Sequence, residues 1–516
     1  MVEHGFKKWM IAATVVLASI IELIDTSIVN VALPHMMGNL GATLDEAAWV
    51  VTSYIVANVI IVPMTAWLSS KFGRRNYFLS SIVLFTISSF FCGHATGIWE
   101  LVIFRFIQGL GGGGLLSTSQ SILVETFPRE QLGLANAMFG MGVVIGPTIG
   151  PTLGGYITDN FSWPWIFYVN LPIGALAVLM TLTFIREPVH KRAVDGIDLG
   201  GILLLTAGVG SLQVVLERGE RLDWFSSKLI VALTITAVVS LIGFVFWELS
   251  RKHPIVDLHV FRYRSLALGT VFTFILGFGL YSSVFIFPVY GQQLLGFSAT
   301  QTGLLMMPGG IATALMMPVI AKLLQARVPP QILNALGFFM FFVFSEILAR
   351  SSLASGQQNF FWPMILQGVA LSCLFVPLTT NALSDLRGPD IAQGTGLTNM
   401  MRQLGGSFGV ALVATFIQHR SWAHRSVLVS HVTNYDPQVR QGLATLAHGF
   451  MQSGANSVQA QDQALHALDQ MVTQQTMMLT YLDAFRIVGY FCLFCIPLLL
   501  LFRRTRGGTP VQTMAH

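Results

Sequence analysis

The chain contains 516 residues, of which 53% are hydrophobic and 10% are charged, and its mean hydropathy is +0.66. Soluble domains average about 25% charged residues, so this composition excludes an ordinary soluble protein and predicts an integral membrane protein. The formal net charge of +5 comes from basic residues spread through short segments rather than gathered in one patch, which argues against a nucleic-acid partner.

Apolar stretches recur along the whole chain. Each is long enough, at about 1.5 Å per residue of helix, to cross a hydrocarbon core of about 30 Å. The fourteen expected spans cover residues 9–33, 48–69, 77–96, 99–124, 134–158, 163–185, 197–217, 227–248, 266–290, 300–322, 331–350, 360–384, 396–418 and 483–502. The sequence therefore predicts an all-α integral membrane protein with 14 transmembrane helices, the first of which is too long for the core of a signal peptide.

The first span carries two acidic residues, Glu22 and Asp25, inside the otherwise apolar run from Trp9 to Leu33. A charge at that depth costs several kcal/mol unless it is paired or reaches water. At helical spacing Asn30 falls on the same stripe as both acids, so one face of the helix is polar. We predict a proton site at Glu22 and Asp25, with Asn30 lining a cavity.

Arg105, in the fourth span, is predicted to be the only cation clearly inside the membrane. By helix rise it lies about 9 Å into its span, and Asp25 lies about 12 Å from the end of its own, so the two depths match. We expect a direct or water-bridged pair between them. Burial favours the neutral form of a carboxyl and a nearby guanidinium favours the charged form, so conformation would set when the proton binds.

The fifth span contains a regular pattern of small residues. Glycines occupy every fourth position and two prolines interleave with them: Gly142, Gly146, Pro147, Gly150, Pro151 and Gly154. A stripe without side chains lets another helix approach closely, and each proline removes a backbone donor and bends the helix. We expect a close helix contact along this stripe.

An internal repeat relates the two ends of the chain. Gln108-Gly109 recurs as Gln367-Gly368 at an offset of 259 residues, and a pattern that begins at Leu134 recurs from Leu397 at an offset of 263. Such repeats place a transporter's substrate site between the halves, near the middle of the bilayer. The predicted units are a six-helix bundle over residues 1–190, an inserted helix pair over 191–255 and a second six-helix bundle over 256–516.

Candidate cavity residues come from both predicted bundles. Tyr281 and Phe285 belong to an aromatic series at helical spacing in the ninth span, which either packs between helices or lines a cavity where it contacts flat cations. Gln108, Gln367 and Asn381 are the polar candidates for the same cavity.

The segment between the last two spans, residues 419–482, is polar and rich in Gln and Ala. Asp436-Pro437 is typical of a helix start, and Leu443, Leu446 and Phe450 recur at helical spacing. We expect two amphipathic helices outside the membrane. They either receive a partner protein or cap the surface.

Charge distribution predicts the topology. If the spans alternate, the segments on the side of the N-terminus hold nineteen Lys and Arg residues and those on the other side hold seven. Segments rich in Lys and Arg stay in the cytoplasm, so both termini are expected there. No cofactor is expected, because Gly111–Gly114 is not followed by Gly-Lys-Ser/Thr and the histidines of residues 419–482 lack metal-ligand spacing.

Several of these motifs resemble one family. The pattern Gly142–Gly155 resembles the antiporter motif of the major facilitator superfamily, and Leu23–Pro34 and Arg105–Gly109 look like the first-helix and fourth-helix motifs of its fourteen-spanner drug:proton antiporters. The length and Gln-rich character of residues 419–482 are similar to those of EmrB-type inner-membrane efflux subunits.

The resemblance implies a major facilitator fold and proton-coupled multidrug efflux from the bacterial inner membrane, with the proton gradient as energy source and antibiotic resistance as the outcome. Drugs and membrane lipids would be its small-molecule partners, and a periplasmic adaptor with an outer-membrane channel its protein partners. The glycines and prolines of the fifth span would act in conformational change, as would Gly73 and Arg74. In that second motif Ala66 and Ser70 replace the usual Gly and Asp.

Two alternatives remain open at this point. The first is a dedicated exporter of a metabolite or siderophore on the same fold, since a fold does not determine a substrate. The second is a non-transporting membrane scaffold or receptor. An enzyme is not expected.

Overall fold

The computed structural model describes residues 5–187, 198–251, 254–433 and 435–501, and every regular element in these ranges is helical. The α-helices are α1 (Phe6–Leu40), α2 (Leu44–Phe72), α3 (Arg74–His94), α4 (Ile98–Thr126), α5 (Leu132–Asn160), α6 (Trp165–Tyr168), α7 (Asn170–Phe184), α8 (Leu199–Arg218), α9 (Lys228–Ser250), α10 (Arg264–Val289), α11 (Ala299–Gln325), α12 (Pro330–Leu348), α13 (Gln358–Leu383), α14 (Pro389–His431), α15 (Pro437–Gln452) and α16 (Ser457–Leu498).

The predicted number of spans is confirmed. Fourteen helical segments of the described residues are long and apolar enough to cross a membrane, with α6 and α7 together forming one of them and α15 forming none. The predicted unit boundary at residues 190 and 191 lies outside the described residues, as do the basic residues of segments 188–197, 252–253 and 502–516 that entered the topology count.

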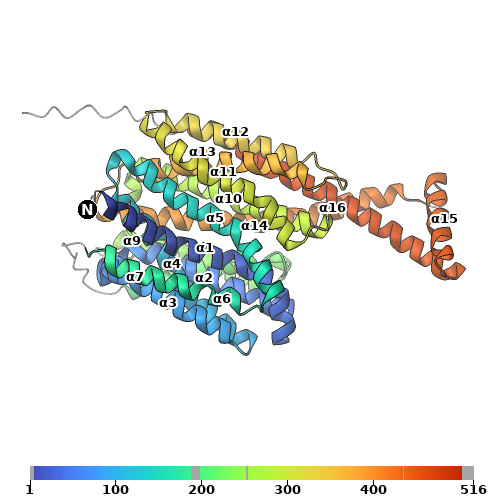
Figure 1. The fold of residues 1–516 in the computed structure, drawn as a ribbon, viewed down its shortest axis with the longest axis horizontal. Coiled ribbons are helices and arrows are strands. Elements are labelled where there is room, and N and C mark those ends of the chain that lie inside the picture. The colour runs from blue at the N-terminus through green and yellow to red at the C-terminus, as the bar shows by residue number, and fades with distance from the viewer. Residues whose placement is uncertain (1–4, 188–197, 252–253, 434, 502–516) are drawn as a thin grey trace, which may run out of the picture.

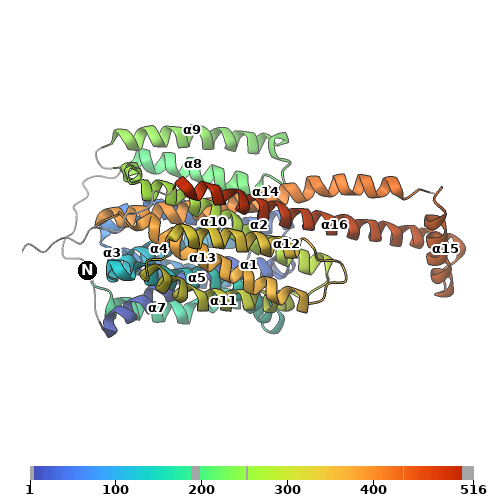
Figure 2. The same ribbon diagram turned by 90° about the horizontal axis from the view of Figure 1, so that it is seen from above.

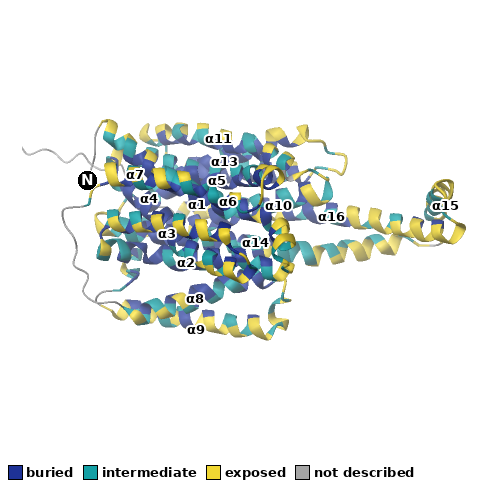
Figure 3. Ribbon diagram, turned by 60° about the horizontal axis from the view of Figure 1, so that its bottom comes forward, coloured by how far each residue is buried: buried dark blue, intermediate teal, exposed yellow. Residues whose placement is uncertain are grey.

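The long helices run side by side along one axis (Figure 1), and α8 and α9 lie together along one edge of the bundle (Figure 2). The first described residues lie at one end of this axis, called here the N-terminal end, and α15 projects from the other, called here the α15 end. Buried residues fill the bundle, whereas the projecting parts of α14 and α16 and all of α15 are largely exposed (Figure 3).

Turns between the helices use ordinary capping chemistry. At the start of α2, Thr43 Oγ1 accepts from the Glu46 amide (3.3 Å) and Glu46 Oε2 accepts from the Thr43 amide (2.9 Å), which satisfies two amides at that helix end. Between α2 and α3 the chain turns at Gly73, whose φ of 88° lies in the region that favours glycine.

The glycine stripe of α5 packs directly on α1. A methyl group added at Gly146 would overlap Leu23, one at Gly150 would overlap Ser27, and one at Gly142 would lie 3.3 Å from Ile20. Only hydrogen at these positions allows the two backbones to approach so closely. α1, which bears both intramembrane acids, therefore lies against α5 along much of its length.

Corresponding contacts recur in the other part of the bundle. α14 packs on α10 through Gly405, beside the Phe274 backbone, and through Gly409, beside the Phe278 backbone. Gly109 likewise brings α4 onto α2, and Gly368 brings α13 onto α11. The helices α1–α7 and α10–α16 are called here the N-terminal and C-terminal halves.

The polar segment near the C-terminus differs from the prediction. Instead of two separate amphipathic helices, the structure contains one separate helix, α15, between long extensions of α14 and α16 (Figure 2). Backbone hydrogen bonds of a helix are local, and neither extension contains Gly or Pro between Ala411 and His431 or between Ser457 and Val488. A change from apolar to polar side chains therefore leaves both helices unbroken.

Candidate functional site

Asp25 of α1 and Arg105 of α4 form a buried ion pair. Asp25 is 0% exposed, Arg105 is 1% exposed, and Arg105 Nη1 lies 2.5 Å from Asp25 Oδ2. The second carboxylate oxygen accepts from Asn170 Nδ2 of α7 (2.8 Å) and Gln108 Nε2 of α4 (3.1 Å). The pairing expected from matched helix depths is therefore direct.

The guanidinium of Arg105 is also surrounded by partners. Its Nε donates to the Val50 carbonyl (3.3 Å), its Nη1 donates to Gln108 Oε1 (2.9 Å), and its Cζ lies 4.1 Å from the centre of the Tyr54 ring. Removing two charges from water is compensated only when further hydrogen bonds satisfy them, and the surrounding α2 and α4 groups supply these bonds. The aromatic face adds cation–π attraction.

Glu22 lies one turn before Asp25 and has different partners. Its Oε1 accepts from Asn58 Nδ2 (2.9 Å) and from the Tyr54 hydroxyl (3.4 Å), both on α2, while its Oε2 has no hydrogen-bond partner among the described residues. Glu22 is 2% exposed. The two acids of α1 therefore share Tyr54 as a neighbour, yet one is bonded to a cation and the other to neutral donors.

Arg402 of α14 is a second buried cation, so the prediction that Arg105 is the only intramembrane one is wrong. Arg402 is 1% exposed, and its Cζ lies 5.6 and 5.8 Å from the ring centres of Phe375 and Phe139. Its Nη2 donates to Asn399 Oδ1 (2.8 Å). The sequence did show an Arg within the thirteenth predicted span. It was overlooked because the flanking residues are apolar.

Hydrogen bonds between neutral side chains join the two halves. Gln403 Nε2 donates to Asn58 Oδ1 (2.7 Å), and Asn399 Nδ2 donates to Gln120 Oε1 (2.7 Å). Gln120 Nε2 in turn donates to Asn136 Oδ1 of α5 (3.2 Å). Asn136 Nδ2 then donates to Thr380 Oγ1 of α13 (3.2 Å). This set, called the crossing network, consists of Asn58, Gln120, Asn136, Thr380, Asn399 and Gln403. It was not predicted, because its bonds join residues far apart in the chain.

The predicted cavity residues are not brought together. Gln108 is fully buried and is hydrogen-bonded to both members of the ion pair. Asn30, by contrast, is exposed. Asn381 lies near the N-terminal end of the bundle, two residues before α13 ends and 14 residues beyond Gln367. It is therefore about 21 Å away from Gln367 by helix rise.

Gln367 borders a small cavity between the halves. The cavity has a volume of about 20 Å³, enough for about one water molecule, and Pro147 of the α5 motif also lines it. Gln367 Nε2 donates to Ser283 Oγ of α10 (2.8 Å). On the same helix Tyr281 and Phe285 are half-buried.

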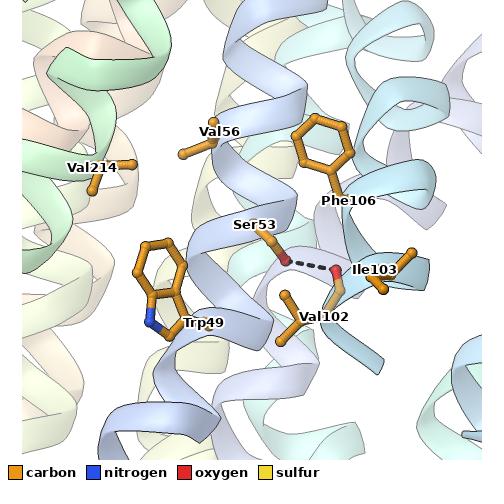
Figure 4. A pocket seen from close by; sticks show the side chains of 7 residues that line it. All are labelled: Trp49, Ser53, Val56, Val102, Ile103, Phe106 and Val214. Carbon is orange, nitrogen blue, oxygen red and sulfur yellow. Dashed lines mark hydrogen bonds between the residues drawn. The ribbon is translucent and has the colours of Figure 1, made fainter. Parts of the chain in front are cut away.

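A larger apolar pocket lies outside the ion pair, where α2, α4 and α8 meet (Figure 4). Its volume is about 330 Å³, and its lining residues are Trp49, Ser53, Val56, Val102, Ile103, Phe106 and Val214. The Ser53 hydroxyl is bonded to the Val102 carbonyl (3.1 Å), so the pocket offers hydrocarbon contacts. Such a lining suits an apolar group from the bilayer.

The loop between α2 and α3 has an ion pair that was not predicted from the sequence. Arg74 pairs with Glu125 of α4, and Glu187 Oε2 accepts from the amide of Arg75 (3.1 Å). Ser70, which replaces the motif's usual Asp, donates to the carbonyl of Ala66 (2.8 Å). Glu125 and Glu187 therefore supply acidic groups to this loop from elsewhere in the chain.

No group of His, Cys, Asp and Glu side chains within the described ranges is arranged to hold a metal ion. All four cysteines, Cys92, Cys373, Cys492 and Cys495, are buried free thiols.

Comparison with known proteins gives a consistent result. The family model described as "Major Facilitator Superfamily" matches residues 15–410. The multidrug export protein EmrB of Escherichia coli K12 is 36% identical over 82% of this chain and 83% of its own length, and the fatty acid resistance protein FarB of Neisseria gonorrhoeae is 35% identical over 89% of each. A solved structure of the proton:xylose symporter XylE is similar in fold, with a TM-score of 0.59 at 13% identity, covering 96% of this chain and 95% of that one.

Proposed function

The chain belongs to the Major Facilitator Superfamily, as a multidrug efflux transporter of the EmrB type, and from this premise we propose that it exchanges protons for lipophilic compounds across the bacterial inner membrane. Proteins of this superfamily are transporters rather than enzymes. The observation that supports proton coupling is the complete burial of two carboxyls, Glu22 and Asp25, within one membrane-spanning helix. Ionisable groups at this depth are expensive and mark proton or substrate pathways.

Competition for the acids of α1 would produce exchange. A proton and a cationic cargo neutralise the same carboxylate, so loading one disfavours loading the other. Glu22 and Asp25 would take a proton from outside and release it inside, and Arg105 would hold Asp25 when neither ligand is bound. The proton gradient then drives export without any chemistry on the cargo.

Movement of the two halves would expose the acids alternately to either side. The crossing network would close one side reversibly, because each of its neutral hydrogen bonds contributes only about 1 kcal/mol net. The glycines of α5 would transmit the motion, since α1 lies on this stripe and carries both acids. With both termini in the cytoplasm, the α15 end would face the periplasm.

The coupling is tested by transport of ethidium, a lipophilic cation, in proteoliposomes with an imposed pH gradient. Glu22→Gln and Asp25→Asn should each abolish gradient-driven ethidium transport, because an amide cannot carry the exchanged proton. Glu130→Gln, at an exposed acid, is the matched control. Full gradient-driven transport by both acid variants would contradict the proposal.

A dedicated exporter is the second candidate, and the relative FarB is the observation that favours it, because that protein is named for fatty acid resistance and matches 89% of this chain. A competition panel separates the two functions. Multidrug transport predicts that unrelated lipophilic compounds each inhibit ethidium efflux, whereas a dedicated exporter would respond to one chemical class. Transport in either case excludes a scaffold or receptor.

We also propose that the α15 end receives a periplasmic adaptor that continues to an outer-membrane channel. Exposed apolar side chains on the extensions, including Trp422 (74% exposed), Val458 (71%) and Leu465 (54%), support this role. Replacing Trp422, Val458 and Leu465 together with Ser should prevent co-purification of a co-expressed adaptor yet leave membrane insertion intact. Unchanged co-purification would argue against the interface.

A further inference from the structure

The buried guanidinium of Arg402 lacks a bonded counter-charge. No described carboxylate lies within ion-pair distance of it, its Nε has no hydrogen-bond partner among the described atoms, and its Nη2 bonds to the neutral amide of Asn399. Each of two phenyl rings near the guanidinium adds about 2 kcal/mol of attraction when desolvated. Burying a cation costs more than this, so Arg402 requires a counter-charge in some state of the protein. Arg105, by contrast, already has Asp25.

Glu22, in the opposite half, is a buried acid without a bonded cation. Its Oε2 is unpartnered in the described part of the chain, and it interacts electrostatically with Arg402. The other titratable or charged groups that act on Glu22 are Asp25 on its own helix, Tyr54 of α2 and Tyr281 of α10. Arg402 is therefore a cation of the C-terminal half that acts on Glu22.

A short path of hydrogen bonds leads from Glu22 across the halves to Gln403, the residue next to Arg402 in the chain. Asn58 donates to Glu22 Oε1 (2.9 Å) and accepts from Gln403 (2.7 Å), the neighbour of Arg402 on α14. Asn58 both donates and accepts in this path, so a change of charge at Glu22 alters the electrostatic field along the path to α14. Glu22 Oε2 at one end of the path lacks a partner among the described residues, as do Gln403 Oε1 at the other end and Nε of the adjacent Arg402.

We propose that Arg402 is the counter-charge by which the C-terminal half responds to the protonation of Glu22. Loss of the proton, which passes to water, creates a carboxylate that attracts Arg402 and draws α14 toward α1 and α2. Uptake of a proton removes this attraction and frees the halves to separate. The inference rests on the proposed proton exchange at Glu22 and makes Arg402 a positioning residue for it.

The direct test follows the ionisation of Glu22. The carboxyl stretching band of Glu22 is identified by infrared difference spectroscopy of the full-length protein against Glu22→Gln, and its pH midpoint is measured. In Arg402→Met the midpoint should rise by about one pH unit, a tenfold gain in proton affinity, because a nearby cation favours the carboxylate. Met fills the site without leaving a polar group unpaired, which favours folding. Arg402→Lys keeps the cation and should leave the midpoint near the wild-type value, and Arg350→Gln, at an exposed guanidinium, should change nothing.

Ethidium transport adds a functional measurement. The pH midpoint of exchange in Arg402→Met should rise with that of the Glu22 band, while Arg402→Lys stays near the wild type. An unchanged Glu22 midpoint in Arg402→Met overturns this inference, even if Glu22→Gln abolishes coupling and the proposed function stands. Laurate, a fatty-acid anion, serves as a second cargo. If Arg402→Met loses laurate transport alone while the Glu22 midpoint is unchanged, the inference is also overturned and Arg402 is assigned to anion binding. A wild-type Glu22 that never changes its ionisation overturns the proposed function itself.

Discussion

The two halves keep the same hydrogen bond but differ in charge. Gln108 of α4 donates to Asp25 of α1, and its repeat equivalent Gln367 of α13 donates to Ser283 of α10, at offsets of 259 and 258 residues. Met364 stands where the N-terminal half has Arg105. The fourth helix of each half is therefore tied to the first in the same way, while the ion pair occurs in one half. Packing and ion coupling are separable roles of this position.

Removing the cation of the ion pair in the N-terminal half should produce the largest effect. Arg105→Ala leaves Asp25 buried without its counter-charge, which we expect to destabilise the protein by about 3–5 kcal/mol and to abolish transport. Unfolding in detergent measures the first effect and ethidium efflux the second. The double variant Asp25→Asn, Arg105→Met should recover most of the stability without recovering transport. An Arg105→Ala variant as stable as the wild type would show that Asp25 does not need its counter-charge, and that the ion pair does not stabilise the N-terminal half.

Adding an acid at the equivalent position of the C-terminal half is the converse experiment. Ser283→Asp places an acid beside Gln367 with no cation at the equivalent of Arg105, and we expect a loss of about 2–4 kcal/mol. Adding Met364→Arg should offset part of this loss, because the N-terminal geometry would be repeated. If Ser283→Asp unfolds like the wild type, the C-terminal half tolerates a lone acid. The absence of a cation at position 364 would then have no effect on stability.

Hydropathy was sufficient to predict the number of spans, because a bilayer requires each crossing helix to be long and apolar. The same criterion failed at the ends of α14 and α16, where it placed a boundary at the change of polarity. Helix continuity depends on local backbone bonds, and no Gly or Pro interrupts either extension. Polarity therefore predicts where a helix leaves the membrane but not where it ends.

A pair of site residues could be predicted where two opposite charges lie at the same depth in neighbouring helices. Asp25 and Arg105 matched in depth, and the structure pairs them. Arg402 was missed because flanking apolar residues raise the average hydropathy of its span and because its repeat equivalent, Phe139, is uncharged. The crossing network could not be predicted from the sequence, since the contact of Asn399 with Gln120 depends on how two halves dock.

Glycines at equivalent positions of the two halves allow close helix packing in both. Gly146 of α5 faces α1, and Gly409 of α14 faces α10, at an offset of 263 residues. An added methyl group forces the helices apart in either place, so Gly146→Ala and Gly409→Ala should each cost about 1–3 kcal/mol in unfolding. Only Gly146→Ala should also displace the acids and shift the pH dependence of transport. Gly38→Ala, with nothing within 4 Å of the added carbon, is the control.

The smallest effect is expected where the extensions of α14 and α16 are joined by charge pairs. Asp483 Oδ2 lies 2.8 Å from Arg420 Nε and 2.9 Å from His424 Nε2, and these side chains are partly exposed. Water and salt screen such pairs, so Asp483→Asn should change global stability by about 1 kcal/mol or less. Faster amide exchange should be confined to the extensions, measured by hydrogen–deuterium exchange, with ethidium transport unchanged. If this variant instead abolished transport, the extensions would be part of the coupling machinery, and charge outside the bundle would matter as much as the difference between its halves.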